Sequence, residues 1–167
     1  MKKLSLLFIA FIFSFQLLAQ SKVGTIDIEY ILSKMPELVQ VGVDVKTYSD
    51  ELDNLFQVKY TKYQVLINVY QENETGYTDA EKKTKQDEII DLENEMQQFQ
   101  QNSSTLIKIR QNELLRPLYM KISEALNVVS NEEKFTQVFT VDNTIVYLDT
   151  NFDITITVMK KIGLPID

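Results

Sequence analysis

Residues 73–81 read NETGYTDAE, and they separate two long helical patterns. Thr78-Asp79-Ala80-Glu81 has the form of a capping box, in which a Thr oxygen accepts a hydrogen bond from an orphan backbone N–H and a Glu three residues later reaches back. Gly76 precedes this box and can adopt the left-handed conformation that follows many helix ends. The stretch therefore predicts the end of one helix and the start of another.

The helix before this turn is predicted to run from Glu37 to Glu74. Its apolar and aromatic residues recur at steps of three and four, which is the spacing of one helix face. They are Val41, Val45, Tyr48, Leu52, Leu55, Phe56, Tyr60, Tyr63, Ile67 and Tyr70.

The helix after the turn is predicted to run from Asp79 to about Ser130, with the same spacing. Pro117 lies inside this pattern and is expected to kink the helix or to mark its entry into the rest of the protein. Two long helices joined by a short turn lie antiparallel, so the numbers of facing residues should sum to about 152. Phe56 would then face Met96.

The middle of this hairpin is polar on its second helix. Glutamine, asparagine and serine residues fill 97–104 around the single Phe99, and they face the stretch 48–55. A seam with so little apolar surface has low local stability. We therefore expect a flexible zone in the middle of the hairpin.

The ends of the remaining chain predict a small β structure. Lys22–Ile28 has the composition of a strand, with Gly24 at a close backbone approach, and Phe135–Asp142 and Ile145–Asp149 predict two more strands. Glu29–Lys34 predicts a short helical turn. A last helix is expected at 154–162, capped by Asp153 and ended by Gly163.

Three short strands leave open edges, and self-association is the simplest way to cover them. We expect strands from several copies to close a small barrel. Its predicted core residues are Val23, Ile26, Val138, Phe139, Val141, Val146 and Leu148.

The first nineteen residues have the layout of a secretory signal peptide. Lys2 and Lys3 precede an apolar run, Leu4–Leu18, and the expected cut follows Ala19 or Gln20. The run is shorter than a membrane-spanning helix needs. An uncleaved anchor is the alternative. The mature protein is therefore expected outside the cytoplasm.

Composition removes several classes of function. The chain of 167 residues has no Cys, His or Trp, which rules out a Ser-His-Asp triad, a thiol nucleophile and the commonest metal ligands. Its formal charge of -7 disfavours nucleic acid as a partner, and its four glycines are isolated, so no phosphate-binding loop is present. We expect no cofactor. We expect no enzymatic activity, since an enzyme would have to use carboxylates alone, with Asp27 and Glu29 or Asp142 and Asp149 as candidates.

The motifs in their order resemble the OmpH/Skp family of periplasmic chaperones. The resemblance rests on Val23–Asp27 with Tyr30–Glu37, on Leu114–Ile122, and on Leu148-Asp149 followed by Asp153–Thr155 and Val158–Leu164. It spans nearly all of the chain after the leader. It implies a homotrimer with a β-barrel body and helical tentacles around a cavity, which holds unfolded outer-membrane proteins without ATP.

The predicted fold is therefore α+β, with a long antiparallel helical hairpin (tentacle) on a small β-barrel body completed by trimerisation. Residues 1–19 are the predicted signal peptide, 20–35 and 115–167 the body, and 36–114 the hairpin. The tip, 71–88, has six acidic residues against three lysines, unlike the basic tips of well-known family members. Membrane or lipopolysaccharide binding is therefore not carried over from the resemblance.

The candidate client contacts are aromatic side chains along the hairpin: Tyr48, Tyr60, Tyr63, Tyr70 and Phe99. The alternative is that these rings pack in the seam between the helices, as aromatic residues at this spacing usually do. The alternative function is an exported coiled-coil scaffold that bridges components of the cell envelope and ignores unfolded chains.

Overall fold

The computed structural model describes residues 21–142 and 144–166. They form two compact units: the hairpin, Pro36–Leu118, and the body, which comprises the described residues before Pro36 and from Tyr119 onward. The sequence placed this junction between residues 114 and 115, one helical turn earlier. The predicted signal peptide lies outside the described residues.

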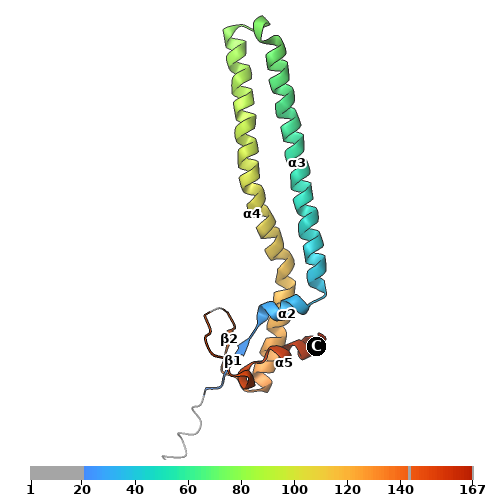
Figure 1. Ribbon diagram of the computed structural model, residues 1–167, viewed down its shortest axis with the longest axis vertical. Coiled ribbons are helices and arrows are strands. Elements are labelled where there is room, and N and C mark those ends of the chain that lie inside the picture. Colours follow the sequence, from blue (N-terminus) through green and yellow to red (C-terminus); the bar gives the residue numbers. More distant parts are fainter. Residues whose placement is uncertain (1–20, 143, 167) are drawn as a thin grey trace, which may run out of the picture. The chain divides into compact units, whose positions relative to one another are not determined.

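The hairpin consists of α3 (Glu37–Asn73), the 3-10 turn η2 (Glu74–Gly76) and the first part of α4 (Asp79–Glu132), which run side by side (Figure 1). The backbone N–H of Thr78 donates to Glu81 Oε2 at 2.8 Å, and the backbone N–H of Glu81 donates to Thr78 Oγ1 at 3.3 Å. These two bonds confirm the predicted capping box. The expectation of a left-handed Gly76 is wrong, because Gly76 lies in η2 without a positive φ.

Contacts across the hairpin give its register. Lys59 Nζ lies 3.1 Å from Glu95 Oε2, the rings of Phe56 and Phe99 stack with centroids 6.5 Å apart, and Gln86 Nε2 donates to Tyr70 OH at 2.8 Å. The paired numbers sum to 154, 155 and 156 rather than to 152.

The difference in register follows from the direction of helical side chains. Side chains lean toward the N-terminus of their own helix, so each covers a spot about one position before its Cα. On each helix of an antiparallel pair, the residue that makes a contact therefore lies about one position later in the sequence than the backbone position that faces the partner. The sum of the two paired residue numbers rises by about one for each helix. Phe56 consequently stacks on Phe99, nearly one turn beyond the predicted Met96.

The body contains a parallel pair of strands. β1 (Val23–Ile26) pairs with β2 (Gln137–Thr140) in the register Val23↔Gln137 to Ile26↔Thr140. Parallel strands need a long crossover. In this chain the crossover comprises α2 (Ile28–Lys34) and the whole excursion through α3 and α4.

Close packing around β1 explains why residue 24 is a glycine. A Cβ on Gly24 would lie 2.7 Å from Phe135 Cε1 and 3.2 Å from the carbonyl oxygen of Phe152. The close backbone approach predicted at Gly24 is confirmed. Phe135 therefore packs against β1 instead of extending β2, which begins two residues later than the sequence predicts.

The core of the body forms where α2, the end of α4 and α5 (Thr155–Ile162) meet around β1. Its most deeply buried side chains include Ile26, Ile31, Ile122, Val129 and Val158. α4 continues through Pro117 without interruption, and the boundary between the units follows at Leu118. α5 ends at Gly163 as the sequence predicts, and Gly163 lies in the left-handed region with φ of 85°. The N-cap of α5 is Ile154 and not the predicted Asp153.

The strand predicted at 145–149 does not form in this chain. This stretch has no regular secondary structure, after a turn in which Asp142 Oδ1 accepts from the Thr144 backbone N–H at 2.8 Å. Val146 is fully exposed and Tyr147 is 83% exposed. A strand needs a neighbouring strand to pair with, and the described residues of one copy offer none at this position. Among residues 21–142 and 144–166, no helix has the length and hydropathy to cross a membrane.

Candidate functional site

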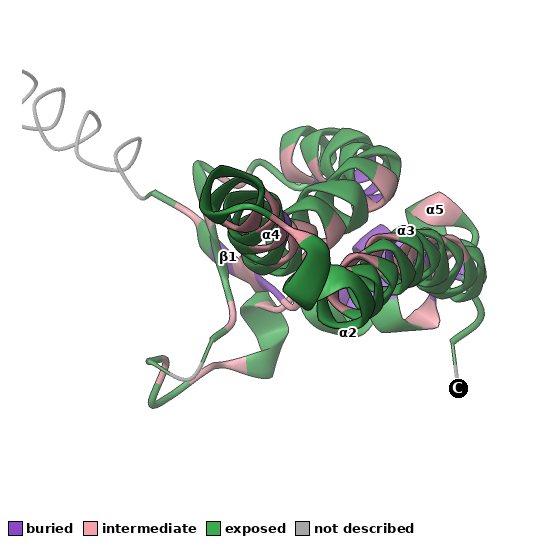
Figure 2. Ribbon diagram, turned by 90° about the horizontal axis from the view of Figure 1, so that it is seen from above, coloured by how far each residue is buried: buried purple, intermediate pink, exposed green. Residues whose placement is uncertain are grey.

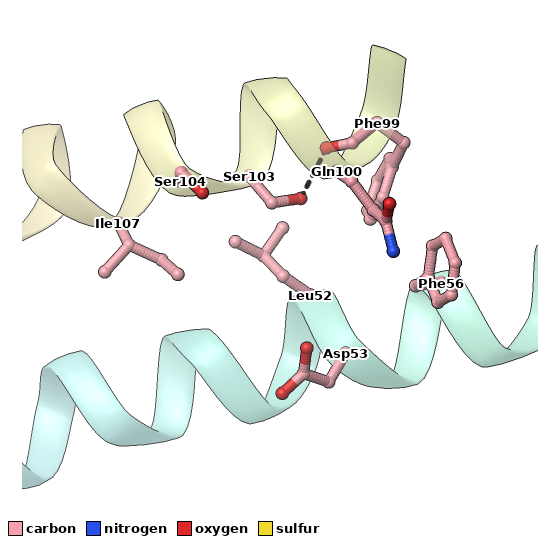
Figure 3. A pocket seen from close by; sticks show the side chains of 8 residues that line it. All are labelled: Leu52, Asp53, Phe56, Phe99, Gln100, Ser103, Ser104 and Ile107. Carbon is pink, nitrogen blue, oxygen red and sulfur yellow. Dashed lines mark hydrogen bonds between the residues drawn. The ribbon is translucent and has the colours of Figure 1, made fainter. Parts of the chain in front are cut away.

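A shallow groove opens between α3 and α4 in the middle of the hairpin. Its volume is about 280 Å³, and Figure 3 shows Leu52 and Phe56 of α3 opposite Phe99, Ser103 and Ile107 of α4. Leu52 is buried at its floor, while Asp53, Gln100 and Ser104 complete the lining. The groove lies in the polar middle that the sequence predicts.

The serines explain why the seam opens at this place. Ser103 Oγ donates to the carbonyl oxygen of Phe99 at 2.7 Å, so its hydroxyl is bound to its own helix rather than to α3. A serine at a seam position leaves the volume that a Leu or Met would fill. The two helices therefore touch through the stacked rings of Phe56 and Phe99, and the groove opens beside this contact.

The predicted client-contacting residues fall into two groups. Phe99 stacks on Phe56, and Tyr70 stacks on Tyr77 with centroids 6.2 Å apart, so both rings take part in the packing of the hairpin. Tyr48 and Tyr63 are half-buried, and Tyr60 is exposed. Contact of these five residues with a client stays a prediction.

The sequence analysis did not identify a row of exposed aliphatic residues on α3, and it assigned one of them, Leu55, to the face that packs in the seam. Leu55, Val58, Val65 and Val69 are all exposed, with Val58 at 69%. With Lys62 they occupy the a and d positions of a heptad pattern, on a flank of α3 next to the seam with α4. We call Leu55, Val58, Lys62, Val65 and Val69 the lateral stripe. The sequence contains the pattern of the lateral stripe, because its residues recur at steps of three and four, as the seam residues do.

The seven predicted barrel-core residues are mostly not buried within one chain. Ile26 is buried, and Val138, Val141 and Leu148 are half-buried. The other three, Val23, Phe139 and Val146, are exposed. The core of a single chain instead uses residues of α2, α4 and α5. The role of the seven residues in a shared barrel stays a prediction.

The candidate carboxylates have local structural partners. Asp27 caps α2 by accepting from the Tyr30 backbone N–H at 2.8 Å, and Asp149 accepts from the Asn151 backbone N–H at 3.0 Å. Hydrogen bonds from Thr144 lower the pKa of Asp142. Burial of Tyr119, together with the nearby charge of Glu29, raises the pKa of that phenol. Within residues 21–142 and 144–166, no cluster of three acidic residues could hold a metal ion.

Two of the three lysines at the tip are paired with acidic neighbours. Lys83 Nζ lies 3.1 Å from Asp87 Oδ2, and Lys85 Nζ lies 2.9 Å from Glu88 Oε2. The bond to Glu88 raises the pKa of Lys85. The tip therefore offers little free positive charge to an anionic surface.

Known proteins share this architecture. The model of the family described as outer membrane protein (OmpH-like) matches residues 22–162. The crystal structure of a candidate outer membrane chaperone (OmpH-like) from Caulobacter crescentus CB15 has the same fold, with a TM-score of 0.65. The two sequences are 13% identical over 89% of this chain and 90% of that chain. A search of curated proteins found no significant match. Because the family model spans most of its length, the chain belongs to the OmpH-like outer membrane protein family.

Proposed function

We propose that this protein is an ATP-independent periplasmic holdase chaperone, which works as a homotrimer and keeps unfolded outer-membrane proteins from aggregating. The single observation that carries the proposal is the hairpin, which exposes aliphatic side chains that its own seam does not use. Only Val41, Leu52, Leu92 and Leu118 are buried among residues 36–118. Such a surface suits many weak contacts with an unfolded chain.

Release of a client needs no nucleotide in this scheme. Insertion into the membrane lowers the free energy of the client, and by mass action it shifts the binding equilibrium toward release from the chaperone. The absence of a phosphate-binding loop from the sequence is compatible with this mode of action.

The trimer is supported by unused edges in the body. β1 has β2 on one edge and an isolated bridge between Thr25 and Asp153 on the other, while the outer edge of β2 has no strand partner among the described residues. Phe139, Val146 and Tyr147 are exposed in the same unit. Strands from three copies would pair these edges and bury these side chains in a shared barrel. The hairpins of the three copies would then surround a cavity for the client.

The test uses the purified mature chain and a urea-unfolded outer-membrane β-barrel protein. The two are diluted together without nucleotide, and the mass of any soluble complex is determined by chromatography with light scattering. A complex of three chains with one soluble client is the expected result. A precipitated client beside an unliganded trimer would overturn the chaperone and favour the scaffold that bridges envelope components. A monomer would overturn the trimer.

A further inference from the structure

The lateral stripe combines exposed aliphatic side chains with an unusual local charge. Residues 54–71 of α3 contain no acidic residue and two lysines, in a chain whose formal charge is -7. Lys59 is paired with Glu95 across the hairpin. Lys62 is exposed and has no ion pair among the described residues. It is therefore a free cation in the middle of an apolar surface.

The geometry of the stripe suits a long, flexible partner. It runs from Leu55 to Val69, about 21 Å at 1.5 Å per residue. Valine has a low helix propensity at exposed positions, because β-branched side chains lose rotamer freedom in a helix. Asn54, Thr61 and Asn68 flank the stripe with neutral polar side chains. Nothing along its length therefore repels an apolar, negatively charged partner.

Lys62 also argues against a second copy of the same stripe as the partner. The a and d pattern would otherwise favour a coiled coil between two hairpins. Lys62 lies midway between Leu55 and Val69. Both a parallel pair in register and a fully overlapping antiparallel pair would therefore place Lys62 against Lys62. Like charges at the centre of so short a seam disfavour that pairing.

We propose that the lateral stripe is a docking surface for unfolded client segments that combine apolar side chains with a carboxylate, and that Lys62 selects the carboxylate while it keeps the hairpins from pairing with each other. This inference rests on the proposed holdase function and names the surface and the client chemistry. The apolar side chains would pack on Val58 and Val65, and the carboxylate would pair with the Lys62 ammonium group. Such exposed ion pairs are individually weak, which suits a partner that must be released.

The experiment measures the binding of two peptides by the full mature chain at low and high salt. Both are extended peptides with alternating apolar residues, and they differ only in a central Asp or Asn. We expect the Asp peptide to bind more tightly, with a preference that high salt reduces. K62E should weaken binding of the Asp peptide roughly twofold to fivefold and leave the Asn peptide unchanged. K82E, at a half-buried lysine of the tip that lies outside the stripe, is the charge-reversal control and should change neither.

Two further variants test the apolar part and the role of Lys62 as a barrier. The double variant V58S/V65S should weaken both peptides and the unfolded outer-membrane client, by roughly tenfold for the peptides. K62L would complete the apolar seam, so it should raise the mass of the assembly in light scattering and lower client binding. Circular dichroism checks that each variant retains the helix content of the wild type.

The outcomes separate this inference from the function on which it rests. Suppose that the wild type keeps the client soluble and that V58S/V65S and K62E bind the peptides and the client as tightly as the wild type does. This result would overturn the docking role of the lateral stripe and leave the holdase function standing. Stripe-dependent binding of the Asp peptide without protection of the client would overturn the holdase alone. Equal effects of K62E and K82E would overturn the selective role of Lys62, and an unchanged mass of K62L would overturn its role as a barrier.

Discussion

The two units of this chain differ in how they use their apolar residues. The body buries Ile31, Ile122 and Val158 almost completely, with α2, α4 and α5 around them. The hairpin is the larger stretch of chain, yet most of α3 and of the neighbouring part of α4 is exposed or half-buried (Figure 2). Stability is therefore concentrated in the body, and the hairpin keeps apolar surface for contacts outside the chain.

The largest expected contrast compares two isoleucines on the same helix. Ile122→Ala removes a side chain that is buried in the body and should lower the free energy of unfolding by about 2–5 kcal/mol, because it leaves a cavity. Ile109→Ala removes the same atoms from an exposed position on the hairpin and should change it by less than about 0.5 kcal/mol. Urea unfolding of the two variants measures the difference. Similar losses would mean that the hairpin is packed as tightly as the body.

Two glycines should respond to alanine with opposite signs. Gly24→Ala drives a Cβ into the Phe135 ring and should cost about 1–3 kcal/mol of unfolding free energy. Gly42→Ala, with nothing within 4 Å of its Cβ, should stabilise α3 by about 0.5–1 kcal/mol. Thermal unfolding checks both. Phe135→Leu combined with Gly24→Ala should recover part of the loss, and no recovery would exclude the clash as its cause.

The groove in the hairpin gives a smaller effect in the stabilising direction. Ser103→Leu puts apolar volume into the groove and should raise the stability of the hairpin by about 0.5–2 kcal/mol. Amide hydrogen exchange at residues 97–104 should slow accordingly. Gln98→Leu adds the same side chain at an exposed position outside the groove and should not slow it. Uniformly slow exchange along both helices of the wild type would contradict the flexible zone.

The helices and their caps were readable from the sequence because their causes are local. Thr78 and Glu81 form the predicted capping box, and α5 ends at Gly163 as predicted. The same reasoning failed at Gly76, because η2 closes the last turn of α3 without a positive φ. The register differed because residue numbers locate Cα atoms, whereas contacts depend on the lean of side chains such as Phe56 and Phe99.

The less predictable features depend on neighbours that the sequence does not name. Residues 145–149 have the alternation of a strand, but alternation does not supply the strand beside it. The residues of the lateral stripe have the same spacing as the seam residues, so periodicity alone could not separate the face toward α4 from the open one. Only the exposure of Val58 and Val65 in the folded hairpin distinguishes them.

The smallest expected effect concerns pH at the tip of the hairpin. The hydrogen bonds that Glu81 accepts from Thr78 lower its pKa below the ordinary value of 4.5. A carboxyl group with a lowered folded-state pKa stabilises the fold above its unfolded pKa and loses that contribution as the pH falls through the folded pKa. Acidification below about pH 4.5 should therefore speed amide exchange at Thr78 and in the first turn of α4.

Glu81→Gln is the matched control for this effect. The amide oxygen can still accept from the Thr78 backbone N–H, as in a capping box with Gln, but it does not titrate. Exchange at Thr78 should then follow the intrinsic pH dependence of an amide, without the added acid-induced opening. Because Glu81 is exposed, the body should be insensitive to the change, and exchange at Val129 should be the same in both proteins. An acid-induced opening that reached Val129 and vanished in Glu81→Gln would mean that the tip and the body unfold as one cooperative unit.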